Sequence, residues 1–177
     1  FKVFATGIPI SARFLNTYNK EEILKEFDLK ENIKTILFFG GGEFGLGKAR
    51  TVEIFKNLVR HFDNIQVVAI AGKNEKMKLE FERIVEENNK QEFVKVLAFT
   101  NKVPELMSIS DLVISKPGGL TTSESLASNL PMIIINPIPG QEEENAEFLE
   151  SKGTGIWLRK EDSSFEVLKS IITDSSR

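Results

Sequence analysis

Short apolar runs alternate with longer amphipathic segments along most of the chain, and this alternation constrains the fold more than any other feature. The longer segments repeat hydrophobic residues at the spacing of a helix that buries one face. Helices of this length between strands form βαβ units, which build a parallel sheet. The sequence therefore predicts an α/β fold, a Rossmann-like parallel sheet with helices on both faces. Predicted strands cover residues 35–39, 65–70, 94–97, 112–115, 132–135 and 155–158, and predicted helices cover 48–60, 75–88, 103–108, 121–128, 142–152 and 165–172.

The composition excludes several classes of protein. The chain of 177 residues shows no internal linker, so residues 1–177 are expected to form a single domain. It has no cysteine and one histidine, which excludes disulfide frameworks and clusters of His or Cys metal ligands. A formal net charge of −3 argues against a nucleic-acid partner. No apolar run approaches the roughly 20 residues of a transmembrane helix.

The first residues read as the middle of a longer protein. Residues 1–4 are Phe-Lys-Val-Phe, without methionine, and look like strand or linker. We therefore expect the chain to be a fragment. Phe4, Phe14 and Leu15 are expected to be exposed where another domain would cover them.

A glycine-rich loop over residues 40–47 follows the first predicted strand of the sheet. In open α/β sheets ligands bind beyond the carboxyl ends of the strands, and glycines allow the backbone to approach an anion. The loop fits the dinucleotide fingerprint, but the second strand ends Ala71-Gly72-Lys73, without the acid that binds a ribose. It also fits a P-loop, but Ala49 stands where a magnesium-binding hydroxyl is needed. A turn that serves packing alone remains an alternative.

A second loop, over residues 115–124, follows the fourth predicted strand and reads Ser-Lys-Pro-Gly-Gly-Leu-Thr-Thr-Ser-Glu. Its glycines and hydroxyls at a helix start could cradle an anion. Glu124 has two readings. It could bind the paired hydroxyls of a sugar, or it could complete an ordinary capping box with Thr121.

A third loop, over residues 137–145, follows the fifth predicted strand. Gln141, Glu142 and Asn145 are hydrogen-bonding groups that suit a ligand with many hydroxyls. The alternative is that the acidic residues simply favour the first turn of a helix through its dipole.

Taken together, the three loops resemble the C-terminal, donor-binding half of glycosyltransferase family 28, in particular that of the diacylglycerol glycosyltransferases and monogalactosyldiacylglycerol synthases. The segments 115–124 and 139–145 carry the resemblance, and residues 6–10 are similar to the family's interdomain strand. The resemblance implies the C-terminal half of a GT-B enzyme, in which two Rossmann-like domains face each other across a cleft. Residues 1–15 would then be the interdomain segment, and the N-terminal acceptor domain would be absent from this chain.

The resemblance also implies a UDP-sugar site. Residues 99–103 would border the uracil, Glu124 would bind the ribose, and residues 118–122 would face the diphosphate. Gln141 and Glu142 would bind the hexose with Asn145 supporting that turn, and residues 41–44 would close the cleft. The implied UDP-sugar-binding residues are Gly41, Gly42, Glu43, Phe44, Phe99, Thr100, Val103, Gly118, Gly119, Leu120, Thr121, Thr122, Glu124, Gln141, Glu142 and Asn145.

The function implied is inverting transfer of a hexose, glucose or galactose, from a UDP-sugar to a lipid, diacylglycerol or a glycosyl-diacylglycerol. The UDP-sugar is a substrate, and no cofactor or metal is expected. The general base would belong to the missing domain, so this chain alone is expected to be inactive. The full-length enzyme would lie peripherally on the cytoplasmic, inner face of the membrane.

Other functions stay open. The chain could be a separate UDP-sugar-binding subunit that needs a partner chain, or a nucleotide-binding module without catalysis. A UDP-sugar epimerase would use Glu43 or Glu142 as acid and base. An NADP-linked dehydrogenase would use Lys73.

Overall fold

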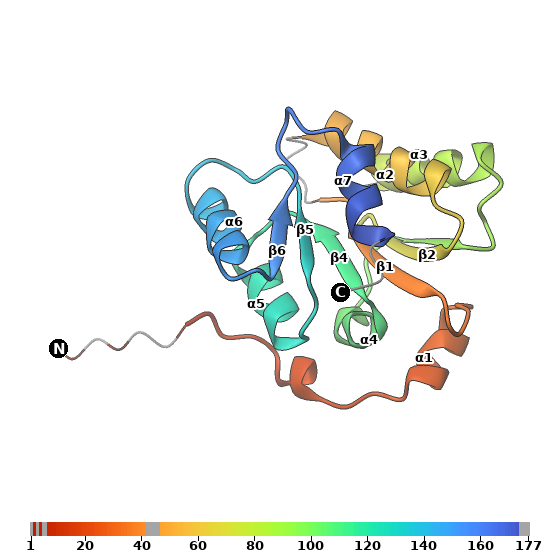
Figure 1. The fold of residues 1–177 in the computed structure, drawn as a ribbon. Coiled ribbons are helices and arrows are strands. Elements are labelled where there is room, and N and C mark those ends of the chain that lie inside the picture. Colours follow the sequence, from red (N-terminus) through yellow and green to blue (C-terminus); the bar gives the residue numbers. More distant parts are fainter. Residues whose placement is uncertain (1, 3, 5–6, 42–46, 174–177) are drawn as a thin grey trace.

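The computed structural model describes residues 2, 4, 7–41 and 47–173 and has the expected α/β architecture (Figure 1). No helix in these described ranges is long and apolar enough to cross a membrane. The strands are β1 (Lys34–Phe39), β2 (Ile65–Ile70), β3 (Val94–Leu97), β4 (Leu112–Ser115), β5 (Met132–Ile134) and β6 (Gly155–Trp157). The helices are η1 (Ala12–Leu15, a 3₁₀ turn), α1 (Lys20–Glu26), α2 (Lys48–His61), α3 (Glu75–Glu87), α4 (Val103–Ile109), α5 (Gly119–Ala127), α6 (Gln141–Ser151) and α7 (Ser164–Ile172).

The strands form one parallel sheet in the order β3-β2-β1-β4-β5-β6. From β1 the chain continues to β2 on one side, whereas from β4 it continues to β5 on the other side. The connections therefore diverge between β1 and β4, and in sheets of this kind such a divergence opens a crevice at the carboxyl ends of the two strands. Ligands of open α/β sheets bind at such a switch point.

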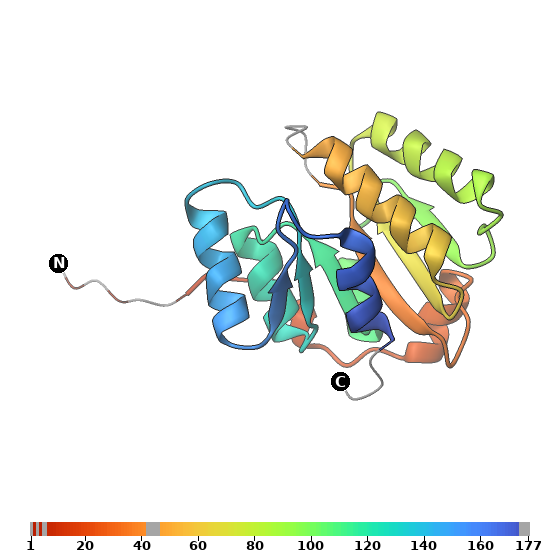
Figure 2. The ribbon, with the colours of Figure 1, turned by 45° about the horizontal axis from the view of Figure 1, so that its top comes forward.

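Both faces of the sheet are covered by helices, and this explains why the strand sequences are apolar throughout. Successive residues of a strand point to opposite faces, and in β1 both Ile36 and Leu37 are buried. Ile36 belongs to a core that it shares with α2, α3 and α7, whereas Leu37 belongs to a second core shared with α4 and α6. Figure 2 shows α2, α3 and α7 together on the near face.

Three phenylalanines hold the first of these cores together. The ring of Phe55 lies 4.1 Å from that of Phe81, and both rings lie within 6 Å of Phe38. Gly40 directly follows β1, and a Cβ placed on it would lie 2.9 Å from Cε2 of the Phe81 ring. Gly40, which fits the dinucleotide fingerprint in the sequence, is therefore needed for packing.

The segment before the sheet lies against the side of the domain that carries α4 and α5. Ser11 caps the turn η1, and Arg13 forms an ion pair of 2.8 Å with Glu105 on α4. Leu15 is 73% exposed, as expected, but Phe14 is half-buried against the second core. The expectation that Phe14 is exposed is wrong because the short turn places this ring toward the sheet.

Candidate functional site

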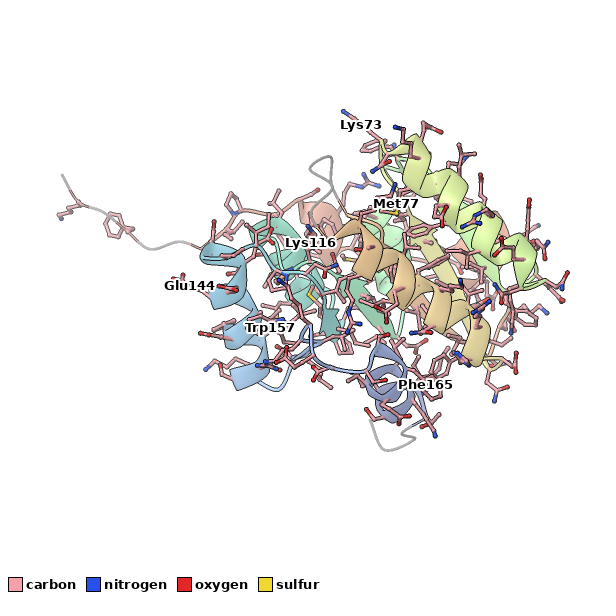
Figure 3. All side chains as sticks on the ribbon, turned by 90° about the horizontal axis from the view of Figure 1, so that it is seen from above. Lys73, Met77, Lys116, Glu144, Trp157 and Phe165 are labelled. Atoms are coloured by element: carbon pink, nitrogen blue, oxygen red, sulfur yellow. The ribbon has the colours of Figure 1, made fainter. Side chains whose placement is uncertain are left out.

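The three loops predicted from the sequence lie at the carboxyl edge of the sheet. The first and second follow β1 and β4, which are neighbours, and the third follows β5 beside them. Figure 3 looks at the molecule from above and shows Lys116 near its middle, between Glu144 on α6 and Met77 on α3. The sheet order thus brings together loops that are far apart in the sequence.

The start of α5 is not capped by a side chain. Its N-cap is Gly118, with extended backbone angles, and within the described part of the chain no side-chain cap is made at this helix start. The amide of Thr122 donates to the carbonyl of Gly118 at 2.8 Å, which leaves the amides of the earlier residues pointing outward without a helical acceptor. Such a terminus carries a partial positive charge and suits an anion.

The side chain of Thr122 adds an unsatisfied group to this helix start. Thr122 is only 6% exposed, and its hydroxyl oxygen is buried with no hydrogen-bond partner within the described structure. Buried hydroxyls are normally paired, because leaving one unpaired costs roughly 1–3 kcal/mol. The neighbouring Ser123 shows the usual arrangement, since its hydroxyl donates to the carbonyl of Gly119 at 2.9 Å.

Glu124 lies within α5 and does not form a capping box. The helix begins at Gly119, two residues before the predicted start, so Thr121 lies inside the first turn instead of preceding it. The capping-box alternative for Glu124 is therefore wrong. Its carboxyl group is half-buried, and this burial raises its pKa.

The second loop also contains exposed positions. Leu120 is 57% exposed, so its side chain is available on the outer face of the helix start. Gly119 approaches the segment before the sheet closely, because a Cβ at this position would lie 2.8 Å from Cδ1 of Ile8. The same Cβ would lie 3.9 Å from Nε2 of Gln141, which places the third loop beside the second.

In the third loop, the acidic residues hold the chain that leads into α6. One carboxylate oxygen of Glu142 accepts from the amide of Ile138 at 2.7 Å, and Glu143 accepts from the amide of Gly140 at 3.4 Å. The other oxygen of Glu142 faces the second loop, 3.9 Å from the position of a Cβ on Gly118. Glu142 therefore both stabilises its own loop and lies at the start of α5.

Asn145 supports a different loop from the one expected. We predicted that it would support the turn containing Gln141, but its amide nitrogen donates to the carbonyl of Pro117 at 2.8 Å. The reason is the helical spacing, which places Asn145 one turn into α6 on the side of β4. It thereby ties the third loop to the second.

The segment expected to border a uracil base lies after β3, at one end of the sheet. Phe99 is 70% exposed, and the hydroxyl of Thr100 accepts from the amide of Lys102 at 3.1 Å. Val103 begins α4 and packs against the second core, so its side chain mainly serves the fold. An exposed aromatic ring next to a stabilised turn is chemically suited to stacking on a base.

The first loop is described only in part. Gly42, Glu43 and Phe44 lie outside the described residues, and Gly41 follows β1 with a φ of +94°. At the far end of the loop the start of α2 is held by Asn136, which follows β5. Its amide nitrogen donates to the carbonyl of Gly47 at 3.2 Å and to the hydroxyl of Thr51 at 2.9 Å.

Sequence reasoning assigned no role to two residues at this edge. Asn136 was missed because its partners lie more than eighty residues away, although its position before a proline and its positive φ of 46° are typical of asparagine in loops. Lys116 stands within the second loop, and the sequence pattern assigns it no role. It is half-buried, and its Cε lies 3.9 Å from the position of a Cβ on Gly41.

Two of the cavities formed by the described residues lie near the sheet. One of about 730 Å³ is at the amino ends of the strands and is lined by apolar groups such as Ile36, Ile133 and Ile171. The other, of about 370 Å³, lies beside the third loop and is lined by Asn136, Trp157 and neighbouring residues. The larger cavity is at the edge opposite to the loops, where ligands of this fold do not bind, so we place the site at the carboxyl edge.

The arrangement is suited to a ligand that has both phosphates and hydroxyls. The start of α5 offers amide donors and a buried hydroxyl, whereas Glu124 and the start of α6 offer acceptors for hydroxyl groups. Within residues 2, 4, 7–41 and 47–173, no group of three or more His, Cys, Asp or Glu residues is placed to hold a metal ion.

The chain is similar in sequence to enzymes that act on diacylglycerol. It is 36% identical over 169 residues to a protein named processive diacylglycerol beta-glucosyltransferase from Bacillus subtilis, a match that covers 96% of this chain and 43% of the relative. The Staphylococcus epidermidis protein of that name is 42% identical over 150 residues, covering 85% and 37%. The chain thus spans less than half the length of these relatives.

Solved structures show the same fold at low sequence identity. MurG from Acinetobacter baumannii is 19% identical with a TM-score of 0.68, and the match covers 96% of this chain and 49% of that one. HepE from Anabaena, solved in complex with UDP and glucose, is 17% identical with a TM-score of 0.70, covering 97% and 46%. The fold is therefore that of the C-terminal half of a GT-B glycosyltransferase. The family description "Glycosyltransferase family 28 C-terminal domain" matches residues 18–177, and the chain belongs to this family.

Proposed function

We propose that this chain binds a UDP-hexose and is the donor-binding half of an inverting glycosyltransferase. The acceptor is a lipid, diacylglycerol or a glycosyl-diacylglycerol. The names of the relatives support both the lipid and glucose as the hexose. The complex of HepE with UDP and glucose supports a UDP-sugar as the donor of a protein with this fold.

One observation carries this proposal: the uncapped start of α5 combined with the buried, unpartnered hydroxyl of Thr122. A bound diphosphate would accept hydrogen bonds from the free amides of Gly119 and Leu120 and would meet the positive end of the helix dipole. Glu124 lies about one turn further along the same helix, so it can accept hydrogen bonds from the hydroxyls of the attached ribose.

The remaining roles follow the order of the loops along the sheet. We place the uracil beside Phe99 and Thr100, because they lie at the β3 end of the sheet. The hexose lies at the other side of the diphosphate, where Gln141 and Glu142 begin α6.

The chemistry requires stabilisation of a leaving group. The bond between the anomeric carbon and the β-phosphate oxygen breaks, its electron pair remains on UDP, and the acceptor hydroxyl oxygen bonds to the carbon while a general base takes the proton. Amides and a helix dipole aimed at the diphosphate stabilise the departing charge. We propose that the base lies in the N-terminal acceptor domain, so this chain alone binds the donor without transferring the hexose and needs no metal to do so.

If the acceptor is a lipid, the reaction takes place at a membrane surface. We propose that the full-length enzyme works at the cytoplasmic face of the membrane, and that residues 1–15 connect the two domains. The separate-subunit alternative differs only in how the acceptor half is supplied. The family assignment gives no support to the dehydrogenase alternative, and the likeness to a UDP-GlcNAc 2-epimerase, at 16% identity, concerns the fold alone.

The test is a calorimetric titration of the chain with UDP and UDP-glucose, in the presence and absence of EDTA. We expect binding in both conditions, and about tenfold or greater weakening in Glu124→Gln because a charged acceptor is lost. Glu144→Gln is the matched control, since Glu144 is exposed in the first turn of α6. Absence of UDP binding by the unmodified chain would contradict the proposal.

Turnover is measured separately with diacylglycerol vesicles and mass spectrometry of the lipids. We expect no glycolipid from this chain alone. Unaided transfer would show that the general base lies in this half. Release of an epimerised UDP-sugar would favour the epimerase alternative instead.

A further inference from the structure

The cavity of about 370 Å³ beside the third loop plays no part in the proposed donor site. It is lined by Pro137 and Pro139 of the third loop, by Trp157 at the end of β6 and by residues that follow β6. It therefore lies at the carboxyl edge of the sheet, where ligands of this fold bind. Its volume is within the range of roughly 300–1,000 Å³ that is usual for small-molecule sites. Both its position and its size suit a second ligand.

Hydrogen bonds hold the walls of this cavity in place. Nη2 of Arg50 on α2 donates to the carbonyl of Arg159 at 3.2 Å and to that of Asp162 at 2.6 Å. The amide of Trp157 donates to the carboxylate of Glu150 at 3.0 Å, and the guanidinium group of Arg159 lies 4.7 Å from the centre of the Trp157 ring. Because the walls are already ordered, a ligand binds here with little loss of conformational entropy.

The charged groups of the cavity favour a neutral ligand over an anion. Both of its guanidinium groups already pair with carboxylates, Arg50 with Glu53 and Arg159 with Glu150, each at 2.7 Å. The other charged side chains that line it are one cation and two anions, Lys160, Glu143 and Glu161. The acidic groups thus outnumber the remaining cation, and a phosphate would be repelled.

A sugar matches this mixture of groups. A hydroxyl both donates and accepts hydrogen bonds, so a ligand with many hydroxyls can use carboxylates and an ammonium group together. Trp157, which is half-buried, adds an aromatic surface with an apolar body, against which the CH groups of a sugar ring can pack.

The third loop separates this cavity from the proposed hexose site. Two neighbouring glutamates at the start of α6 lie on different sides of the loop. One carboxylate oxygen of Glu142 lies 3.9 Å from a Cβ position on Gly118 in the second loop, whereas Glu143 lines the cavity. A sugar in the cavity would therefore lie across one short loop from the hexose of the donor.

We propose that this cavity binds the hexose head group of a glycosyl-diacylglycerol, with Glu143 accepting hydrogen bonds from its hydroxyls and Trp157 packing against its ring. This inference rests on the proposed function and deepens it, because it assigns a place to the sugar of the acceptor. Of the two acceptors proposed above, it selects the glycosyl-diacylglycerol over diacylglycerol itself.

The test follows the fluorescence of Trp157, which is the one tryptophan in the sequence and therefore reports on this cavity. The chain is first saturated with UDP-glucose, which fills the proposed donor site, and is then titrated with hexyl β-D-glucopyranoside. We expect a saturable change in fluorescence. Hexan-1-ol, which has the alkyl chain without the sugar, should cause none. Saturation-transfer NMR of the glucoside detects binding independently of the fluorescence.

A pair of glutamate variants tests the contact with the hydroxyls. Glu143→Gln should weaken binding of the glucoside about tenfold, because hydrogen bonds to a charged acceptor are stronger than those to a neutral one. Its affinity for UDP, measured by calorimetry, should stay unchanged, which also shows that the variant is folded. Glu144→Gln is the matched control, since Glu144 is the next residue of α6 but is exposed and lies outside the lining of the cavity.

Each outcome decides a separate question. If the unmodified chain does not bind UDP, the proposed function fails and this inference fails with it. If it binds UDP but neither fluorescence nor NMR detects the glucoside, or hexan-1-ol binds equally well, the function stands and the sugar site is overturned. Equal affinity of Glu143→Gln and the unmodified chain for the glucoside would also overturn it.

Discussion

Two helices at the flanks of the sheet, α3 and α7, begin differently from the two at its centre, α2 and α5, although all four start at the same edge. In α3 the side chain of Asn74 accepts from the amide of Met77 at 3.0 Å, and in α7 Ser163 accepts from Glu166 at 3.4 Å. In the centre, α2 and α5 begin at glycines without a side-chain cap. Side chains thus satisfy the starts of α3 and α7, whereas α2 and α5, beside the crevice, begin without a side-chain cap. The start of α4, which follows the edge strand β3, also lacks one.

The presence or absence of a side-chain cap affects the stability of each helix. A side-chain cap contributes about 0.5–2 kcal/mol to stability, so helices without one give up stability in the free protein. A bound phosphate would supply the missing acceptors at the centre. Ligand binding should therefore stabilise the domain, as it does whenever a ligand binds the native state and not the unfolded chain.

The largest effect is expected when the central helix is made to resemble the flanking ones. Gly118 has the backbone angles usual for an N-cap, φ −61° and ψ 148°, and the nearest atom to a Cβ there is 3.9 Å away. Gly118→Asp places a carboxylate on the amides of α5, where we expect the diphosphate. Repulsion between the two anions should weaken UDP binding by roughly 100-fold or more, which calorimetry would measure.

The variant Gly118→Ser distinguishes the effect of capping α5 from the effect of adding a negative charge. Its hydroxyl can cap α5 without a negative charge, so the variant should be more stable by a few tenths of a kcal/mol and should lose less affinity. Thermal unfolding without ligand checks the first point. If the aspartate variant bound UDP as well as the unmodified chain, the start of α5 would not be the diphosphate site.

A change at the start of the flanking helix α3 should affect stability and leave UDP affinity unchanged. Asn74→Ala removes the cap of α3, which should cost about 1 kcal/mol and lower the melting temperature by roughly 2–4 °C. UDP affinity should not change, because Asn74 follows β2 and lies outside the crevice. A loss of affinity in this variant would mean that the difference between flank and centre is unrelated to ligand binding.

The elements of the fold could be predicted from the sequence because each strand and helix has a clear hydrophobic period. The apolar run 65–70, for example, became a strand buried on both faces, as the lack of alternation predicts. The start of α5 was placed two residues late because Gly119 and Leu120 are not typical of a first turn. The residue at which a helix begins depends on weak conformational preferences of a few amino acids, and the tertiary structure around the crevice can override these preferences.

The candidate site could be predicted only as three loops. The order of the strands in the sheet decides which loops become neighbours. Hydrophobic periodicity predicts where the strands lie in the sequence, but it does not predict their order in the sheet. The bond from Asn145 to Pro117 and the closeness of Cε of Lys116 to a Cβ position on Gly41 both join segments distant in sequence. Glu124 is separated from the other glutamates only by the family resemblance, since spacing alone also allows a capping box; its ribose-binding role stays a prediction.

The smallest expected effect concerns the pH dependence of the central helix. Burial raises the pKa of Glu124 above its ordinary value of 4.5. The folded chain therefore binds this proton more tightly than the unfolded chain does. The ionised carboxylate destabilises the fold above the raised pKa, and this destabilisation disappears as the pH falls below 4.5.

Glu124→Gln removes this penalty, so the variant without ligand should unfold at a slightly higher temperature than the unmodified chain near neutral pH and at the same temperature in acid. UDP binding should respond with the opposite sign, because ribose hydroxyls donate to the ionised carboxylate. The affinity of the unmodified chain should then fall, relative to that of Glu124→Gln, as the pH drops through the raised pKa. Titration of UDP itself affects both proteins equally, so a constant ratio of the two affinities across this range would exclude Glu124 as the ribose acceptor.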